Sequence, residues 1–232
     1  MIGVFDSGIG GLNVLKELTK LMPERDFIYF GDSNNCPYGE KSDSELMAIT
    51  TSIVMHFKEM GCKIIVIACN TATTRCMKKL RKQFPDLIFV GTVPAIKVAC
   101  DRESKKTLVM ATPATIDSER TEELVRDYKR PDQEIFLVPC EGLASAIEHK
   151  NYYDIRKIIK NIHEEYKDKG IDAIVLGCTH YPNAKKQIEE FFPNVPLLDG
   201  SNGVAREVKR QICKNHISSV GQTGEVKILD TL

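Results

Sequence analysis

A chain of 232 residues with 42% apolar residues can fill one large or two small hydrophobic cores, which excludes a disordered chain and a minimal scaffold. Its 32 basic residues balance its 32 acidic ones, and no segment concentrates bases without acids nearby, so the basic surface of a nucleic-acid binder is missing. The longest apolar runs are far too short to cross a bilayer, and no basic segment precedes the strand-like run at Ile2, so we expect a cytoplasmic protein without a membrane partner.

Short runs rich in Ile, Val, Leu and Phe alternate along the chain with longer amphipathic stretches. Such alternation is typical of βα units around a parallel sheet that is buried on both faces. We therefore predict the α/β class with mainly parallel sheets. The predicted strands are residues 2–5, 26–31, 64–68, 88–91, 107–111, 134–138, 173–176 and 196–198. The predicted helices are residues 12–22, 42–60, 74–84, 116–130, 153–169 and 184–192.

The glycine-rich stretch "DSGIGGLNVL" follows the first predicted strand and opens the first helix. Its glycines do not fit the GxGxxG pattern, and it lacks the GK[ST] of a phosphate-binding loop. We therefore predict a tight turn that brings Asp6 and Ser7 to the carboxyl edge of the sheet, rather than a nucleotide site. No lysine stands in a context that indicates a pyridoxal Schiff base, so no cofactor is expected.

The eight cysteines are predicted to be reduced thiols, because the chain is long and shows no secretory signal. They form no CxxC pair and the five histidines form no HxxxH arrangement, so no metal site is expected. Four cysteines lie within or beside helical or apolar patterns and are predicted to be buried structural residues: Cys62, Cys76, Cys100 and Cys213.

Two other cysteines each stand directly after a predicted strand and before a helix. They are Cys69 in "IIVIACNTAT" and Cys178 in "AIVLGCTHYP". Ligands of open α/β sheets bind at the carboxyl ends of the strands, where the N–H groups of a helix start attract anions. A buried structural role is the alternative for both residues, but their neighbours are hydroxyl, amide and imidazole groups, which favours a functional role.

A thiol reacts as the thiolate, which is favoured by a helix N-terminus or a protonated histidine, and His180 lies two residues beyond Cys178. One cysteine with a base would suggest acyl transfer. Two thiols at equivalent positions favour another reaction, in which one group removes a proton from a carbon and the other returns a proton to the opposite face. The product of such a reaction is the inverted stereocentre.

Six motifs in this order resemble the glutamate racemases of the aspartate/glutamate racemase family. They are "FDSGIGGL" at residues 5–12, "YFGDSNNCPYG" at 29–39, "ACNTAT" at 68–73, "ATIDS" at 114–118, "PCEGLASAIE" at 139–148 and "LGCTHYP" at 176–182. In this family the second motif usually carries an Arg ahead of "PYG", where this chain has Asn34 and Asn35.

The resemblance implies two similar α/β lobes with the active site in the cleft between them. The first lobe would comprise residues 1–92 plus 199–232 and the second residues 93–198. The implied enzyme is an isomerase that needs no cofactor and no metal. It would bind glutamate, form a homodimer and supply D-glutamate for peptidoglycan in the cytoplasm of a bacterium.

The resemblance also implies roles for single residues. Cys69 would act on the α-proton of the D-enantiomer and Cys178 on that of the L-enantiomer. Asp6 and Asp32 would assist beside Cys69, and Glu148 and His180 beside Cys178. Substrate contacts would come from Asp6, Ser7, Pro37, Tyr38, Gly39, Asn70, Thr71, Thr115 and Thr179, whose amide, hydroxyl and backbone groups suit an amino acid.

Structural roles are the alternatives for the four assisting residues. Asp6 would then cap its turn, Asp32 would organise its loop, His180 would be a hydrogen-bond partner and Glu148 an exposed helix residue.

Three alternative functions stay open on the same fold. The first is aspartate racemase, because one methylene changes discrimination by only about 1–3 kcal/mol. The second is an amino-acid-binding protein without activity. The third is a Cys/His hydrolase or lyase that uses Cys178 and His180 alone.

Overall fold

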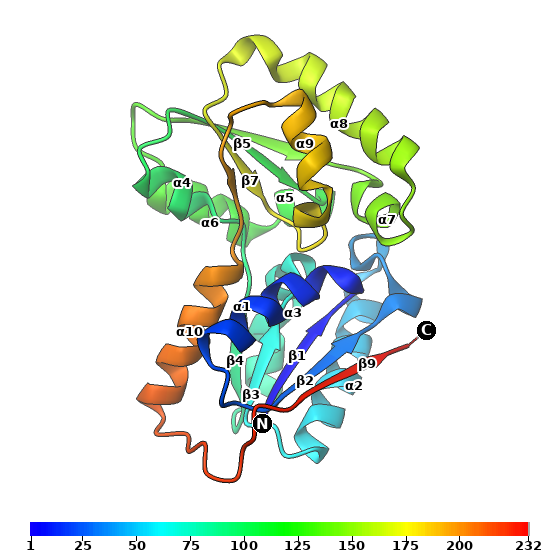
Figure 1. The fold of residues 1–232 in the computed structure, drawn as a ribbon, viewed down its shortest axis with the longest axis vertical. Coiled ribbons are helices and arrows are strands. Elements are labelled where there is room, and N and C mark those ends of the chain that lie inside the picture. The colour runs from blue at the N-terminus through cyan, green and yellow to red at the C-terminus, as the bar shows by residue number, and fades with distance from the viewer. Residues whose placement is uncertain (232) are drawn as a thin grey trace. The chain divides into compact units, whose positions relative to one another are not determined.

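The computed structural model describes residues 1–231 as an α/β protein, which confirms the predicted class (Figure 1). The chain divides into two compact units. Unit 1 comprises residues 1–92 together with the segment that begins at Ser201, and unit 2 comprises Val93–Gly200.

Unit 1 is built on a five-stranded parallel sheet with the strand order β4-β3-β1-β2-β9 (Figure 1). Its strands are β1 (Ile2–Asp6), β2 (Phe27–Gly31), β3 (Ile64–Ile67), β4 (Ile88–Gly91) and β9 (Val226–Asp230). Its α-helices are α1 (Leu12–Leu21), α2 (Asp43–Glu59), α3 (Asn70–Gln83) and α10 (Ser201–Lys214). Short 3-10 turns occur at Ile9–Gly11, Ser33–Asn35 and Tyr38–Glu40.

Both faces of this sheet are buried, as the unbroken apolar runs of its strands predict. Ile2 and Val4 of β1 pack with α1 and α10 on one face. Phe5 points to the other face, where it joins the apolar side chains of α2 and α3. Because successive side chains of a strand alternate between faces, one five-residue strand contributes to both cores.

Unit 2 has a four-stranded parallel sheet with the order β6-β5-β7-β8. Its strands are β5 (Lys106–Ala111), β6 (Glu134–Pro139), β7 (Ala173–Leu176) and β8 (Leu197–Leu198). Helices α4 (Ile96–Asp101), α5 (Pro113–Ile116) and α6 (Glu119–Tyr128) contribute to one core. Helices α7 (Leu143–Glu148), α8 (Tyr152–Tyr166) and α9 (Lys185–Phe191) contribute to the other, with 3-10 turns at Lys167–Lys169 and Tyr181–Ala184.

The two units repeat one topology. In unit 1 the first strand lies between the second and third, and the fourth lies beyond the third; the same order, counted from β5, describes unit 2. Strand β9 is an addition to unit 1 that has no counterpart among the described strands of unit 2. The third strand of each unit, β3 or β7, therefore ends at an equivalent place.

All eight predicted strands are present, with bounds within one residue of the prediction. Strand β9 and helices α4, α7 and α10 were not predicted. The helix predicted at residues 116–130 is present as α6, but it begins later, at Glu119, because the Ser118 hydroxyl accepts a hydrogen bond from the Thr121 N–H at 3.2 Å. The short helix α5 ahead of it was not predicted. Helix α3 begins at Asn70, four residues before the prediction.

Among the residues that the structure describes, no helix combines the length and the apolar character needed to cross a membrane.

Gly3 lets a phenyl ring lie directly against the central strand of unit 1. A Cβ at this position would lie 2.7 Å from Cγ of Phe57, whose side chain is fully buried. Gly203 in α10 is the opposite case, since a Cβ there would meet nothing within 4 Å. The two glycines thus form a matched pair, one in a packed core and one at an open helical position.

We predict that Gly3→Ala lowers the free energy of unfolding by about 1–3 kcal/mol, because the added methyl group overpacks the core against Phe57. Gly203→Ala should instead raise it by about 0.5–1 kcal/mol, because alanine is the better helix former. Urea unfolding followed by circular dichroism measures both values. Equal stabilities of the two variants would contradict the packing described for Gly3.

Candidate active site

Each unit ends its third strand with the same local arrangement. The Ala68 N–H donates to the Phe5 carbonyl at 2.8 Å, one residue beyond β3. The Gly177 N–H donates to the Met110 carbonyl at 2.7 Å, one residue beyond β7. The next residue is Cys69 in unit 1 and Cys178 in unit 2. Both thiols therefore stand two residues past the last strand residue, at the carboxyl edge of their sheet.

Cys69 is the residue from which helix α3 starts. It is 6% exposed and has an extended backbone, and its carbonyl accepts the Thr73 N–H at 2.9 Å. The next two residues, Asn70 and Thr71, form the first turn of α3 and are buried. The buried Oδ1 of Asn70 has no hydrogen-bond partner in the structure. A buried acceptor of this kind suits a ligand that brings an N–H or ammonium group.

Asp6 ends β1 beside this position and is fully buried. Its Oδ2 accepts the Gly11 N–H at 2.8 Å. A Cβ at Gly11 would lie 2.5 Å from the Asp6 Cβ, so only glycine allows the turn to close on this carboxylate. The glycine-rich stretch is thus the tight turn that the sequence predicted, and it brings Asp6 and the buried Ser7 to the carboxyl edge.

Asp32 follows β2 and is 2% exposed. The Tyr38 hydroxyl donates to its Oδ2 at 2.7 Å, and the Asn35 side-chain amide lies 2.9 Å from Oδ1 and 3.1 Å from Oδ2. Pro37 and Gly39, the other predicted substrate contacts of this loop, are half-buried, and the Cys36–Pro37 peptide bond is cis.

Tyr38 lies close to the acidic groups at the carboxyl edge of the unit 1 sheet. Burial raises the pKa of the Tyr38 hydroxyl far above its ordinary value, and the charges of Asp32, Cys69 and Asp6 raise it further. The phenol therefore stays protonated and serves as a hydrogen-bond donor. Unit 1 thus gathers Asp6, Asp32 and Cys69 around one buried tyrosine.

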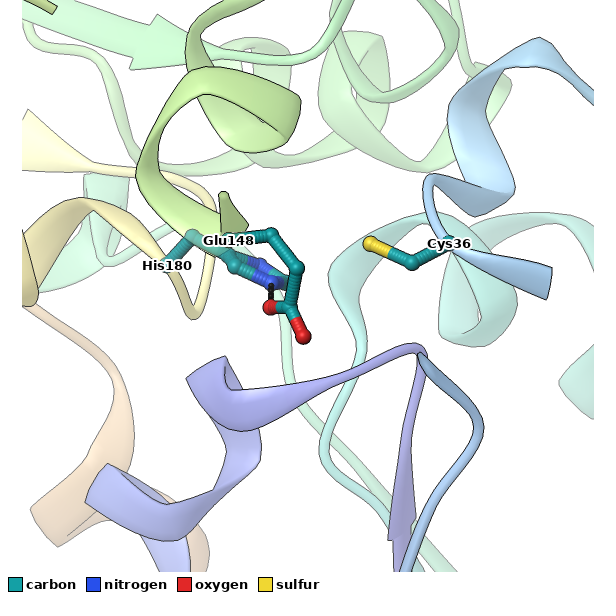
Figure 2. Close-up of side chains that lie close together, drawn as sticks. All are labelled: Cys36, Glu148 and His180. Carbon is teal, nitrogen blue, oxygen red and sulfur yellow. Dashed lines mark hydrogen bonds and ion pairs between the residues drawn. The ribbon is translucent and has the colours of Figure 1, made fainter. Parts of the chain in front are cut away.

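In unit 2 the side chains of Cys178, His180 and Glu148 are linked by hydrogen bonds. Cys178, 7% exposed, has its Sγ 3.8 Å from Nδ1 of His180, and Nε2 of His180 lies 2.7 Å from Oε2 of Glu148. Figure 2 shows the carboxylate of Glu148 directed at the imidazole of His180. The side chains of His180 and Glu148 are 2% and 8% exposed.

This geometry orients the imidazole. When neutral His180 donates its Nε2–H to Glu148, its Nδ1 is left as an acceptor that faces the Cys178 thiol. The carboxylate also stabilises the imidazolium that forms if the thiol proton moves to Nδ1. The hydrogen-bonded pair of His180 and Glu148 can therefore take a proton from the Cys178 thiol and return it.

The remaining predicted contacts of unit 2 are buried as well. Thr179 is 7% exposed and follows Cys178 directly. Thr115 is fully buried in α5, where its hydroxyl accepts a hydrogen bond from Thr112 Oγ1 at 3.0 Å and its carbonyl accepts one from Thr121 Oγ1 at 2.6 Å. These bonds give Thr115 a clear part in shaping its turn.

The other thiols divide by burial. Cys62, Cys76 and Cys100 are buried, as predicted, whereas the prediction for Cys213 was wrong and this residue is exposed. It lies on the solvent side of α10, whose buried residues include Val204, Val208 and Ile212. Burial raises the pKa of Cys140 to about 12 and that of Cys62 to about 11.

The sequence missed the hydrogen-bond donors to Asp32. The sequence shows Asn35 only as a departure from the family pattern and predicts Tyr38 only as a substrate contact, whereas the structure shows that both donate hydrogen bonds to Asp32. The short spacing of Asp32, Asn35 and Tyr38 is the signal that could have indicated a local network, because side chains of one tight loop face each other readily.

The chain matches a known protein family and curated proteins. The model of the family described as Asp/Glu/Hydantoin racemase matches residues 2–208. The curated glutamate racemase of Clostridium acetobutylicum is 39% identical over 235 residues, which covers 100% of this chain and 91% of that protein.

Solved structures of glutamate racemases are also similar to this chain. The glutamate racemase of Francisella tularensis in complex with D-glutamate has a TM-score of 0.84 at 30% identity, covering 100% of this chain and 88% of that one. The Escherichia coli glutamate racemase in complex with L-glutamate and the activator UDP-MurNAc-ala has a TM-score of 0.81 at 25% identity, covering 100% and 98%.

We predict that Cys140 and Cys62 resist iodoacetamide at pH 8 in the folded protein, while the exposed Cys213 reacts. A raised pKa favours the neutral thiol, so at pH 8 a group with a pKa near 12 is only about one part in ten thousand thiolate. Peptide mass spectrometry measures the labelling of each residue, with urea-unfolded protein as the control in which all eight cysteines react. Equal rates for Cys140 and Cys213 in the folded protein would contradict the burial described here.

Proposed function

Because this chain belongs to the Asp/Glu/Hydantoin racemase family, we propose that it interconverts L- and D-glutamate without a cofactor. The family and its isomerase class are those that the sequence motifs predicted. Glutamate is supported as the substrate because the curated relatives at 38–39% identity are named glutamate racemase. The Francisella tularensis enzyme of that name was solved with D-glutamate bound.

The observation that carries the proposal is the repeated position of the two thiols. Cys69 and Cys178 follow equivalent strands, after equivalent backbone hydrogen bonds, in two units of one topology. A two-base racemisation needs two acid/base groups of the same kind, one for each enantiomer. A repeated strand end with the same residue meets that need in a simple way.

In the proposed reaction one cysteine begins as the thiolate and the other as the thiol. The thiolate takes the α-proton of the bound enantiomer, leaving negative charge on the α-carbon and its carboxylate. The thiol then gives its proton to the opposite face of that carbon. The enantiomer is inverted, and the two sulfur atoms have exchanged protonation states.

On the Cys178 side, His180 and Glu148 would manage the thiol proton. L-glutamate would lose its α-proton to Cys178, while His180 accepts or returns a proton through Nδ1 at 3.8 Å from the sulfur. The Glu148 contact at 2.7 Å fixes the ring in that role. Positioned acid/base groups of this kind contribute roughly 10²- to 10⁴-fold to a rate.

On the Cys69 side, D-glutamate would lose its α-proton to Cys69, with Asp6 and Asp32 as the assisting carboxylates. Both carboxylates are nearly fully buried and held by hydrogen bonds, so they keep a fixed direction. The start of α3 directly after Cys69 adds backbone N–H groups that favour the negative charge of the intermediate.

Substrate recognition would use the polar groups beside each thiol. The unpartnered Oδ1 of Asn70 is a suitable acceptor for the substrate ammonium group. Ser7, Thr71 and Thr179 are buried hydroxyl residues that follow β1, β3 and β7 respectively, and they would bind the carboxylates. Pro37, Tyr38, Gly39 and Thr115 complete the proposed set.

The cellular part of the proposal rests on the family resemblance of the sequence motifs alone. The protein would supply D-glutamate for peptidoglycan and act in the cytoplasm as a homodimer. Each of these properties extends the family resemblance and can be tested separately from the reaction.

We predict that deuterium enters the α-position of both enantiomers of glutamate when purified protein acts in D2O without added cofactor. Proton NMR follows the loss of the α-proton signal, and circular dichroism follows inversion. Aspartate should exchange at least about tenfold more slowly, since one methylene is worth about 1–3 kcal/mol in a pocket fitted to the longer chain. Faster exchange of aspartate would reassign the substrate, and exchange of neither amino acid would leave a binding protein.

We predict that Cys69→Ser and Cys178→Ser each reduce racemisation by roughly 10²- to 10⁴-fold while the protein stays folded. The loss in kcat/KM should be equal in both directions for each variant, because the equilibrium constant between enantiomers is one. The exposed Cys213→Ser is the matched control and should keep wild-type rates. A Cys69→Ser variant with normal turnover would support the alternative enzyme that uses Cys178 and His180 alone.

A further inference from the structure

The edge strand β9 reaches the loop that carries Asp32 from about two hundred residues away in the sequence. It pairs in parallel with β2, in a register that sets Asp230 opposite Gly31. The next residue on each strand is Thr231 and Asp32. The register alone therefore places Thr231 beside the proposed assisting carboxylate.

Asp230 and Thr231 hold this loop by several hydrogen bonds, and we refer to the two residues as the clasp. The Thr231 N–H donates to the Gly31 carbonyl at 3.1 Å, and the Ser33 hydroxyl donates to Oδ2 of Asp230 at 3.2 Å. The Asn34 N–H donates to Oγ1 of Thr231 at 3.0 Å, and the Asn34 side chain donates to the Thr231 carbonyl. The clasp thus binds the residues on both sides of Asp32.

The clasp also reaches the carboxylate itself. Oγ1 of Thr231 lies 3.4 Å from Oδ1 of Asp32. Because this hydroxyl already accepts the Asn34 N–H, its own proton is available for the carboxylate. Thr231 and Asn35 then serve Oδ1, while Tyr38 and Asn35 serve Oδ2.

Strand β9 adds little to the core of unit 1. Val226 is 41% exposed and Ile228 is 61% exposed, and Leu229 is the partly buried residue of the strand that packs against the core. The C-terminal end of β9 therefore contributes to unit 1 mainly through the hydrogen bonds of the clasp, and the strand buries little apolar area. A substitution in the clasp can change the Asp32 loop without removing core packing.

We infer that Thr231 is a positioning residue for racemisation, which orients the Asp32 carboxylate beside Cys69 through the clasp. The inference rests on the proposed function of Asp32 and adds a residue that lies outside all the family motifs found in the sequence. Asn34 and Asn35 also take part in this network. The clasp and the two asparagines therefore form one hydrogen-bond network around Asp32.

The test compares Thr231→Val with two other variants. Thr231→Val keeps the shape of the side chain and removes the hydroxyl, and Thr231→Ser restores the hydroxyl. Thr223→Val is the matched control. Thr223 lies just ahead of β9, and its hydroxyl is 3.4 Å from Oδ1 of a different aspartate, Asp26. All three substitutions replace one threonine of the same segment.

We expect Thr231→Val to lower kcat by roughly three- to tenfold, the effect of one lost hydrogen bond, with KM within about twofold. Thr231→Ser and Thr223→Val should keep wild-type kcat. The primary deuterium isotope effect on kcat/KM should rise for D-glutamate, whose proton goes to Cys69, and not for L-glutamate. A merely structural loss would reduce the amount of active enzyme and leave both isotope effects unchanged.

A second readout needs no activity. The ¹³C signal of the Asp32 carboxylate should move in Thr231→Val and stay in place in Thr223→Val. An unmoved signal, unchanged kcat in Thr231→Val, or an equal loss in Thr223→Val would overturn the inference. If the Asp32 signal moves as expected but the wild-type protein racemises neither enantiomer, the clasp is real and the proposed function is what fails.

Discussion

One backbone hydrogen bond in each unit determines where the cysteine at the strand end stands. The bonds from Ala68 to Phe5 and from Gly177 to Met110 extend the pairing of the central strands by one residue, and the chain then turns away at a cysteine. At Gly177 a Cβ would lie 2.9 Å from that of Ala111, so the turn in unit 2 depends on glycine. Because a register shift of one residue would send every side chain to the other face, the apolar packing of the sheets fixes the thiols indirectly. The chemistry at the strand ends thus depends on the cores beneath them.

The polar groups at these strand ends are buried, and hydrogen bonds compensate for their loss of water. Asp6 is held by a backbone N–H, Asp32 by a phenol and an amide, and Glu148 by an imidazole. An unpartnered buried carboxylate would be strongly unfavourable, so each of these contacts stabilises the fold around its carboxylate. Groups that are held in this way need little reorganisation when charge develops in a reaction.

The sequence predicted the strands well because buried parallel strands are short apolar runs between polar breaks, as at Ile64–Ile67 and Ala173–Leu176. It missed β9, because Val226–Asp230 is a mostly exposed strand whose short apolar run is interrupted by Lys227 and ended by Asp230. The early start of α3 was missed because Asn70 and Thr71 are buried polar residues without an apolar period. The family resemblance placed Glu148 and His180 beside Cys178, but their direct contact across 32 residues comes from the structure, as does the contact between Thr231 and Asp32, which are 199 apart. Only the fold brings such pairs together.

In the proposed racemisation one thiol removes the α-proton and the other supplies a new proton, so each thiol acts as the base for one enantiomer. The most direct test is the position of the label at early times, when L-glutamate is converted in D2O and both enantiomers are separated before they re-enter the enzyme. Two thiols predict that the D-glutamate formed carries deuterium, because its proton comes from the second thiol, while the remaining L-glutamate keeps its protium. Transfer of the substrate's own proton into D-glutamate would show that a single base serves both faces, and it would contradict the account.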